Sequence, residues 1–446
     1  MKNIRKLALE TLLKIDYDGA YSNLEIKRTL QRFPIKDDDR RLYLTIVYGC
    51  LQNQIYLDYL ITQQSSRPVK KLHKEVSEIL RIAIYQLYFL DKIPNYAIVN
   101  EAVNLAAEIQ PQAKGFINGV LRNIMRKIDE NGREFKFENW DNEKEALSIR
   151  YSVPLWIVHK YYEAYGAEKA EAIMPMLNEK PPFTVRCNTL KTSKEQLIQD
   201  LQQAGVEALS ASFSTNAINV TNLGIFESNI ENSRLYRDGH FSIQDQAAML
   251  TVERLNPQPG DRVLDMCAAP GGKTMYLSEM MNNSGEIVGR DVYGSRLKLV
   301  EQSASRLGCT NIRLEEQDGC EYSPIDEASF DKILLDAPCT GLGVIRRKPE
   351  IKYRSTKEGR KALVKIQSTL LENAVRYLKP GGELLYSTCT INKDENENQI
   401  GKLLIKFPQL QIIPDEHGSN YTYTSPLMEG SDCFFMCRLK KMDVYE

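Results

Sequence analysis

The spacing of apolar residues changes twice along the chain, and each change marks an expected domain. Up to about residue 130, apolar positions recur every three or four residues, as in "IRKLALETLLKID" and "VSEILRIAIYQLYFL", which is the spacing of amphipathic helices. Acidic residues open "DDDRRLYLTIVYGCLQNQIYLDYLIT", as they do in the first turn of a helix. We predict an all-helical bundle over 1–140, with a charged linker near 129–145.

The next region mixes helical and strand patterns. "SVPLWIVHKYYEAYG" and "AEKAEAIMPMLNEK" have helical spacing, whereas "PFTVRCNTL" and "NAINVTNL" have the pattern of strands. Between these strands lies "SKEQLIQDLQQAG", a helix pattern with Ser193 at its start and Gly205 at its end. These patterns predict a small α+β domain over 146–240.

From residue 241 onward, short strand patterns alternate with helical ones. The expected strands are "DRVLDMCA", "GEIVGRDV", "NIRLEEQD", "FDKILLDAPC", "GELLYSTCT", "LQIIPD" and "DCFFMCRLKK". Alternating strands and helices form a doubly wound, mainly parallel sheet, so we predict an α/β domain with a seven-stranded sheet over 241–446. Ligands of such sheets bind beyond the carboxyl ends of the strands.

Charge and hydropathy argue against a membrane or secreted protein. The 446 residues include 58 Lys and Arg and 59 Asp and Glu, a net charge of −1, which by itself gives no support for nucleic-acid binding. The first 150 residues have a mild basic excess, 24 against 20. No apolar run approaches the roughly 18–20 residues that span a membrane, and the N-terminus is amphipathic rather than secretory. We expect a cytoplasmic protein without a membrane partner.

The nine cysteines are scattered, and no CxxC pair occurs among them. We therefore expect no metal site, and no disulfides in a reducing compartment. A free cysteine usually packs as a small apolar residue, so any functional cysteine needs an argument of its own.

A glycine-rich turn in "VLDMCAAPGGKT" (263–274) joins an expected strand to a helix. A P-loop would require glycine at the position of Cys267, and the GxGxxG pattern of dinucleotide sites is absent. The turn is therefore expected to hold a ligand without phosphate. Asp291 and Asp318 end the next two expected strands, where they could bind a ribose diol and an adenine amine. A nucleoside without phosphate suggests S-adenosylmethionine; the alternative is that both acids are helix N-caps.

Two cysteines are expected at the ends of neighbouring strands. "LLDAPCTGLGVIRRKPE" (334–350) places Asp336 and Cys339 after one strand, and "LLYSTCT" places Cys389 after the next. A thiolate that adds to C6 of a pyrimidine makes C5 nucleophilic enough to accept a methyl group. An acid near N3, for which Asp336 is the candidate, would stabilise the adduct. Two thiols near a cofactor turn therefore favour methylation at carbon 5 of a pyrimidine over simple packing.

These stretches carry a specific resemblance. "DMCAAPGGKT", "LLDAPCTGLGVIRRKPE" and "LKPGGELLYSTCT" resemble the motifs of RNA cytosine-C5 methyltransferases of the Sun/NOL/Fmu group, and "FSIQDQAA" resembles the segment before their catalytic domain. "AIVNEAVNLA" and "GFINGVLRNIMR" resemble the NusB-like domain of the RsmB branch. The resemblance implies a class I, Rossmann-like methyltransferase domain after a NusB-like bundle and an RRM-like α+β domain. Its main departure is Cys433, which replaces a usual glycine.

The resemblance also implies roles for particular residues. Cys389 would be the nucleophile and Cys339 would assist product release. The cofactor S-adenosylmethionine would contact Cys267, Ala268, Ala269, Pro270, Gly271, Gly272, Lys273, Asp291, Arg296, Asp318 and Asp336. The implied substrate is one cytosine of 16S rRNA, and a monomer is expected.

Basic residues near these motifs are candidates for RNA contacts. Arg346, Arg347 and Lys348 follow Cys339 closely and could bind phosphates; the alternative is a solvated basic turn. In "RCNTLK" (186–191), Arg186 and Asn188 are expected to touch either RNA or a domain junction; simple packing is the alternative. Two other functions remain open: a non-catalytic RNA-binding assembly factor, and a related enzyme acting on tRNA.

Overall fold

The computed structural model describes residues 3–133, 142–222 and 230–443. Its contacts divide the chain into two compact units, Met1–Lys180 with Ile345–Arg354, and Pro181–Val344 with Ser355–Glu446. Residues 134–141 of the linker predicted near 129–145 lie outside the described residues. No helix in the described ranges is long and apolar enough to cross a membrane.

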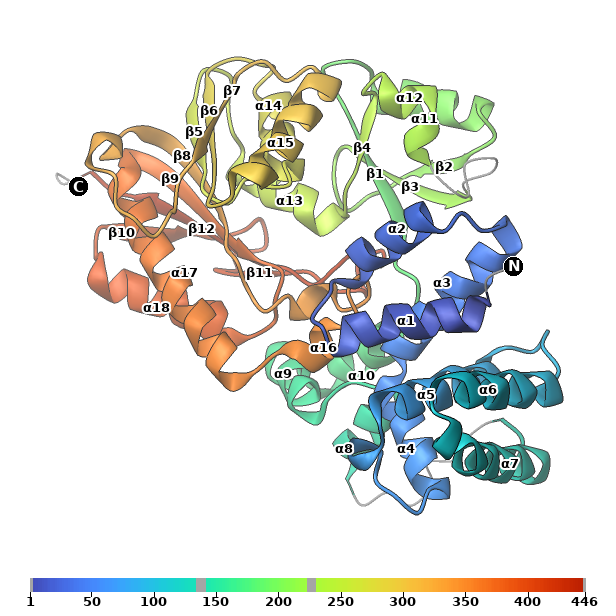
Figure 1. Ribbon diagram of the computed structural model, residues 1–446. Helices are drawn as coiled ribbons and strands as arrows, with labels where there is room; N and C mark the ends of the chain where they lie inside the picture. Colours follow the sequence, from blue (N-terminus) through green and yellow to red (C-terminus); the bar gives the residue numbers. More distant parts are fainter. Residues whose placement is uncertain (1–2, 134–141, 223–229, 444–446) are drawn as a thin grey trace. The chain divides into compact units, whose positions relative to one another are not determined.

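The first unit contains only helices in its described part, which confirms the predicted bundle (Figure 1). The α-helices are α1 (Ile4–Asp16), α2 (Ser22–Arg32), α3 (Asp37–Gln52), α4 (Gln54–Gln64), α5 (Lys74–Phe89), α6 (Asn95–Ile109), α7 (Lys114–Asn131), α8 (Glu143–Arg150), α9 (Leu155–Tyr165), α10 (Ala167–Met176) and α16 (Ile351–Arg354). Helices α9 and α10, which we predicted within the α+β domain, have their contacts in this unit.

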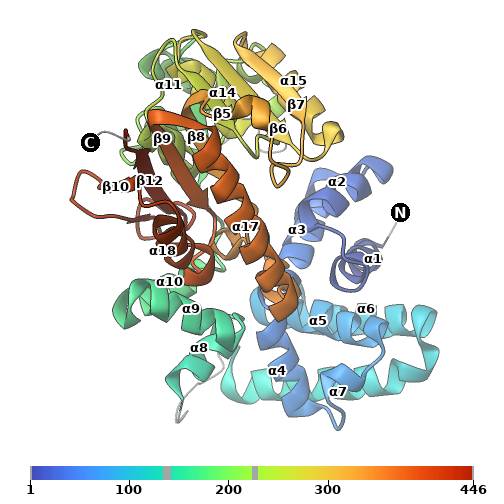
Figure 2. The same ribbon diagram turned by 90° about the vertical axis from the view of Figure 1, so that its left-hand side faces the viewer.

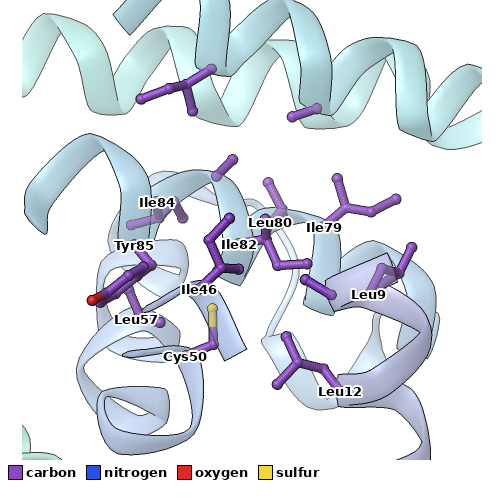
Figure 3. Close-up of a cluster of buried hydrophobic side chains, with 14 of the residues drawn as sticks. Leu9, Leu12, Ile46, Cys50, Leu57, Ile79, Leu80, Ile82, Ile84 and Tyr85 are labelled. Carbon is purple, nitrogen blue, oxygen red and sulfur yellow. The ribbon is translucent and has the colours of Figure 1, made fainter. Parts of the chain in front are cut away.

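The core of this unit forms around α5, whose residues from Val76 to Leu87 are all buried. Figure 3 shows side chains of α1, α3 and α4 packed against it, with Cys50 among them. A Cβ at Gly49 would lie 1.9 Å from the ring of Tyr85. Helices α3 and α5 can therefore approach this closely only because α3 has glycine at this position. Burial raises the pKa of the Cys50 thiol well above its usual value, as expected for a packing cysteine.

A ten-residue excursion, Ile345–Arg354, belongs to the helical unit although it lies in the middle of the second unit's sequence. Lys352 Nζ donates to the Gln52 carbonyl at 2.7 Å, and the Tyr353 hydroxyl donates to the Leu51 carbonyl at 3.1 Å. Burial lowers the pKa of Lys352 to about 7. The sequence patterns did not predict this excursion.

The second unit begins with a small antiparallel sheet, as predicted. Its strands are β1 (Phe183–Cys187), β2 (Glu207–Ser210), β3 (Ala217–Asn222) and β4 (Phe241–Ile243), in the order β2-β3-β1-β4. Helix α11 (Lys194–Gln203) packs on this sheet through Leu197 and Leu201, and Ser193 caps its first turn.

The large sheet has the order β10-β12-β9-β8-β5-β6-β7, with the short β11 paired to β12. Its strands are β5 (Arg262–Asp265), β6 (Glu286–Asp291), β7 (Ile312–Glu316), β8 (Phe330–Asp336), β9 (Leu378–Thr388), β10 (Leu410–Ile413), β11 (Thr422–Tyr423) and β12 (Phe435–Lys441). The pairs from β7 to β9 are parallel, and β12 is antiparallel to β9 and β10. The seven predicted strands are therefore present, with β11 in addition.

Helices cover both faces of this sheet. Apolar side chains of α13 (Gln246–Leu255), α14 (Gly272–Met280) and α15 (Gly294–Leu307) pack on one face. Helices α17 (Lys357–Tyr377) and α18 (Glu397–Lys406) pack on the other (Figure 2). The strand order reverses between β5 and β8, and a ligand site of a doubly wound sheet is expected at that point.

Candidate active site

Two thiols meet just beyond the carboxyl ends of β8 and β9. These strands run parallel with Asp336 opposite Ser387, so the residues that follow them emerge at the same edge of the sheet. The Sγ atoms of Cys339 and Cys389 are 3.3 Å apart, and both residues are half-buried. The sequence placed both cysteines correctly at neighbouring strand ends.

Gly343 allows the two cysteine loops to approach each other. Its N–H donates to the Cys389 carbonyl at 2.9 Å, and its own carbonyl accepts from Cys433 N at 3.0 Å. A Cβ at Gly343 would lie 1.8 Å from the Cys433 carbonyl oxygen, so no larger residue fits. Cys433 is buried, and its backbone supports this turn.

An ion pair joins the end of β8 to the end of the glycine-rich turn. Lys273 Nζ is 2.6 Å from Asp336 Oδ2, and Ser387 Oγ donates to Asp336 Oδ1 at 2.9 Å. Burial by itself lowers the pKa of Lys273, but the charge of Asp336, their hydrogen bond and the charge of Cys389 raise it above its usual value. Lys273 therefore keeps a positive charge beside Asp336 and Cys389.

The environment of Cys339 favours its protonated form. The hydrogen bond to Cys389, followed by burial and the charges of Cys389, Glu395 and Asp336, raises the pKa of the Cys339 thiol well above its usual value. Cys339 therefore keeps its proton and can donate a hydrogen bond toward Cys389. A protonated thiol is a poor nucleophile, so Cys339 is suited to a role other than attack.

The glycine-rich turn is held by its backbone. Ala268 N donates to the Arg290 carbonyl at 2.7 Å, and Gly271 N donates to the Ala268 carbonyl at 2.7 Å. Gly271 has a φ of 104° and is the N-cap of α14, a conformation that favours glycine. Below the turn, Asp265 accepts from Thr274 Oγ1 at 2.7 Å, and burial raises the pKa of this carboxyl to about 6.

The two other predicted acids lie at or just after the ends of β6 and β7. Asp291 is the last residue of β6, and its carboxylate is bound by Arg296 at 3.1 Å. Arg296 also donates to the Ala269 carbonyl at 2.9 Å, so it ties this acid to the glycine-rich turn. Asp318 lies two residues beyond β7 and accepts from Cys320 N at 2.8 Å. Neither acid is the N-cap of a helix, so the N-cap alternative is wrong.

The structure corrects part of the predicted RNA surface. Arg186 and Asn188 are fully buried, so a direct RNA contact is wrong for both and the domain-junction alternative holds. Arg346 is also buried, whereas Arg347 is half-buried and Lys348 is exposed.

Arg186 joins the small sheet to the cofactor turn. Its guanidinium donates to both Glu279 oxygens, at 2.6 and 3.0 Å, and to the Gly272 carbonyl at 2.6 Å. Asn188 Nδ2 donates to the carbonyls of Gly239 and Leu307, both at 2.8 Å. Strand β1 therefore holds the start of α14 and the end of α15.

Replacing Arg186 with methionine should destabilise the second unit strongly. The change leaves the Glu279 carboxylate buried without its partner, a loss of about 3–5 kcal/mol for a broken buried ion pair. Chemical denaturation, followed by far-UV circular dichroism, should show a lower midpoint for the variant than for the wild type. The double variant Arg186→Met with Glu279→Met should recover much of the loss; an unchanged midpoint in the single variant would contradict this role of the pair.

Sequence reasoning missed the polar residues that hold the two cysteine loops together. Glu395 and Asn396 are fully buried, and Gln367 of α17 is buried beside them. Glu395 and Asn396 lie in the run "NKDENENQ" (392–399), which has the composition of an exposed, capped helix start. Burial reversed that interpretation.

Family models match the chain in three consecutive segments. They are the NusB family at 2–126, the ferredoxin-like domain of RsmF/B-like methyltransferases at 153–224, and the 16S rRNA methyltransferase RsmB/F at 252–440. The probable ribosomal RNA small subunit methyltransferase B of Bacillus subtilis is 33% identical over 98% of this chain and 99% of its own length. The Escherichia coli ribosomal RNA small subunit methyltransferase B is 31% identical over 99% of both chains.

Solved structures share the fold. The crystal structure of PH0851 covers 99% of both chains with a TM-score of 0.81 and 26% identity. A methyltransferase homolog protein from Pyrococcus horikoshii covers 68% of this chain and 100% of its own, with a TM-score of 0.60 and 30% identity.

The fold, the cofactor turn and the family matches define an S-adenosylmethionine-dependent methyltransferase of ribosomal RNA. More narrowly, the chain belongs to the RsmB family of 16S rRNA methyltransferases, which carry a NusB domain in front. The resemblance found in the sequence motifs is thereby confirmed.

Proposed function

We propose that this enzyme methylates carbon 5 of one cytosine in 16S rRNA through a covalent bond between Cys389 and C6 of the base. The single observation that carries the proposal is the 3.3 Å separation of the two thiols beyond the carboxyl ends of β8 and β9. Cysteines with only a structural role would not need to be partly exposed at the ends of strands. We further propose that the enzyme acts as a monomer in the cytoplasm.

The residues of the site divide the chemistry among them. The Cys389 thiolate adds to C6, and the electrons displaced from the C5–C6 double bond make C5 nucleophilic. Asp336 is the acid proposed near N3, and the Lys273 ammonium that pairs with it at 2.6 Å supplies positive charge beside it; together they stabilise the charge that develops on the ring. S-adenosylmethionine, when bound, supplies the methyl group.

Product release reverses the addition. Loss of the C5 proton to solvent restores the double bond and expels Cys389 as a thiolate. Cys339 keeps its proton because its pKa is raised, so it donates a hydrogen bond to the departing sulfur. This accounts for a role of Cys339 in release rather than in attack.

The residues around the glycine-rich turn fit S-adenosylmethionine. The acids there are Asp265, Asp291, Asp318 and Asp336, which would repel a phosphate but suit a sulfonium cation and ribose hydroxyls. Arg296 holds Asp291 against the turn. We propose that the backbone of Cys267–Lys273 and the acids at 291, 318 and 336 bind the cofactor.

Basic residues after Cys339 are proposed to bind RNA. Lys348 is exposed and Arg347 is half-buried, and both lie in the excursion that begins shortly after the Cys339 loop. Phosphate contacts there would orient the RNA, since such contacts fix register without reading sequence.

Bisulfite sequencing tests the proposed reaction. The purified enzyme, S-adenosylmethionine and unmethylated 16S rRNA should give one cytosine that resists conversion, and omission of the cofactor should give none. Uniform conversion in both samples would overturn the proposal. If titration also showed no binding of S-adenosylmethionine, a non-catalytic assembly factor would be favoured; methylation of tRNA alone would favour the tRNA enzyme.

A further inference from the structure

A carboxylate without exposed surface lies behind the two thiols. Glu395 ends the short turn η7 (Lys393–Glu395), six residues after Cys389, and is 0% exposed. It accepts hydrogen bonds from Thr340 N at 2.9 Å, Thr340 Oγ1 at 2.7 Å, Gln367 Nε2 at 3.0 Å and Asn392 Nδ2 at 3.0 Å.

The groups that contact the Glu395 carboxylate are hydrogen-bond donors. The backbone amide of Thr340 and the side-chain amides of Gln367 and Asn392 offer only N–H groups to the two carboxylate oxygens. A buried carboxylate is tolerated when such donors replace its lost water. The site therefore suits a charged Glu395 better than a neutral side chain.

The same network reaches both cysteine loops. Thr340 follows Cys339 in the chain, and its Oγ1 is 2.8 Å from Oγ1 of Thr390, which follows Cys389. Gln367 Nε2 also donates to the carbonyl of Pro338 at 2.9 Å. Glu395 is therefore connected to the residues on both sides of Cys339 and to the residue after Cys389.

Neighbouring polar residues hold Glu395 itself in place. The Tyr386 hydroxyl of β9 donates to the Glu395 carbonyl at 2.6 Å. Asn396 accepts from Thr388 Oγ1 at 2.6 Å and donates to the Thr390 carbonyl at 2.9 Å. The turn after Cys389 is thus anchored to the strand that precedes it.

We propose that Glu395 is a positioning residue that fixes the Cys339 loop against the Cys389 loop, so that the two thiols stay within contact during product release. It touches neither RNA nor cofactor in this role and acts through Thr340 and Gln367. The inference rests on the proposed function for the release role of Cys339. The positioning of the Cys339 loop by Glu395 does not depend on that function.

The charge of Glu395 gives a second effect. The groups that face Cys339 are Cys389, Glu395, Asp336 and Tyr386. The hydrogen bond to Cys389 and burial are the larger causes of the raised pKa of Cys339, and the negative charges of Glu395 and Asp336 add to them. Removing the charge at Glu395 should lower the pKa of Cys339.

The test compares Glu395→Gln with Asp394→Asn. Both substitutions keep the side-chain shape and remove one negative charge, but Asp394 is exposed and accepts a hydrogen bond from the neighbouring Asn398 side chain at 2.9 Å. In the Cys389→Ser background, alkylation of Cys339 by iodoacetamide is followed against pH by mass spectrometry. Glu395→Gln should move the half-maximal pH down by at least half a unit, about threefold in rate at fixed pH, and Asp394→Asn should not.

A second readout uses the otherwise wild-type enzyme with 16S rRNA and S-adenosylmethionine. Glu395→Gln should release product at least tenfold more slowly and accumulate a denaturant-stable enzyme–RNA adduct, with the KM for S-adenosylmethionine unchanged. Thr340→Val, which removes one hydroxyl donor and keeps the backbone amide, should give a smaller change in the same direction if Glu395→Gln does not fold.

The outcomes separate the two proposals. An unchanged alkylation profile together with wild-type release in both variants overturns the role of Glu395. If the wild-type enzyme forms no methylcytosine at all, the proposed function fails, while a shifted alkylation profile would still support Glu395 as the residue that positions Cys339.

Discussion

Replacing Cys389 with alanine is expected to abolish methyl transfer to 16S rRNA, with a loss of about 10⁴-fold or more, as for other enzymes that lose their nucleophile. C5 of cytosine is not nucleophilic until a thiolate has added to C6, so no other group of the site can replace this sulfur. Transfer of labelled methyl from S-adenosylmethionine to rRNA measures the effect. Binding of S-adenosylmethionine, measured by calorimetry, should stay within a few-fold of wild type because the proposed cofactor contacts do not include Cys389.

Cys309→Ala is the matched control for this variant. Cys309 is buried in the same unit, against Met275 and Leu297, and has no proposed role in chemistry. It should keep near-normal transfer. Full activity of Cys389→Ala would exclude Cys389 as the nucleophile, whatever the control shows.

Replacing Cys339 with alanine is expected to trap the covalent intermediate. Cys389 can still attack and methylation can still proceed, but the departing sulfur loses the thiol that lies 3.3 Å away. Enzyme incubated with labelled rRNA and S-adenosylmethionine should give a slowly migrating band on a denaturing gel, at least tenfold stronger than wild type. Its mobility should return to normal after protease digestion.

The double variant with Cys389→Ala shows whether that band comes from the proposed bond. It should form no band, because the attacking sulfur is gone. A band that persists in the double variant would mean attachment through another residue, and absence of the band in Cys339→Ala would count against the release role of Cys339.

The parts of the site that were predictable from sequence are those at strand ends. A buried strand followed by a loop has a recognisable pattern, and parallel strands bring their ends to one edge. For this reason the positions of Asp336, Cys339 and Cys389 followed from pattern and order alone. The helical bundle was equally clear because its apolar spacing persists over many turns.

The residues whose environment was not predicted share a physical cause: charge and polarity in a sequence do not reveal burial. Arg186 was a candidate for an RNA or domain-junction contact, and Glu395 lies in a run typical of an exposed helix start, yet each is buried with hydrogen bonds that replace water. Their partners come from distant segments, which local spacing cannot identify.

The excursion Ile345–Arg354 gives the protein an unusual connectivity. The backbone passes between the units three times, after Lys180, after Val344 and after Arg354. A catalytic fragment that begins at residue 181 would keep this decapeptide. It would lose the carbonyls of Gln52 and Leu51, which accept hydrogen bonds from Lys352 and Tyr353. The isolated front fragment would in turn lack α16. Each fragment is therefore expected to be less stable than the same residues in the uncut polypeptide, which is the better basis for biochemical work.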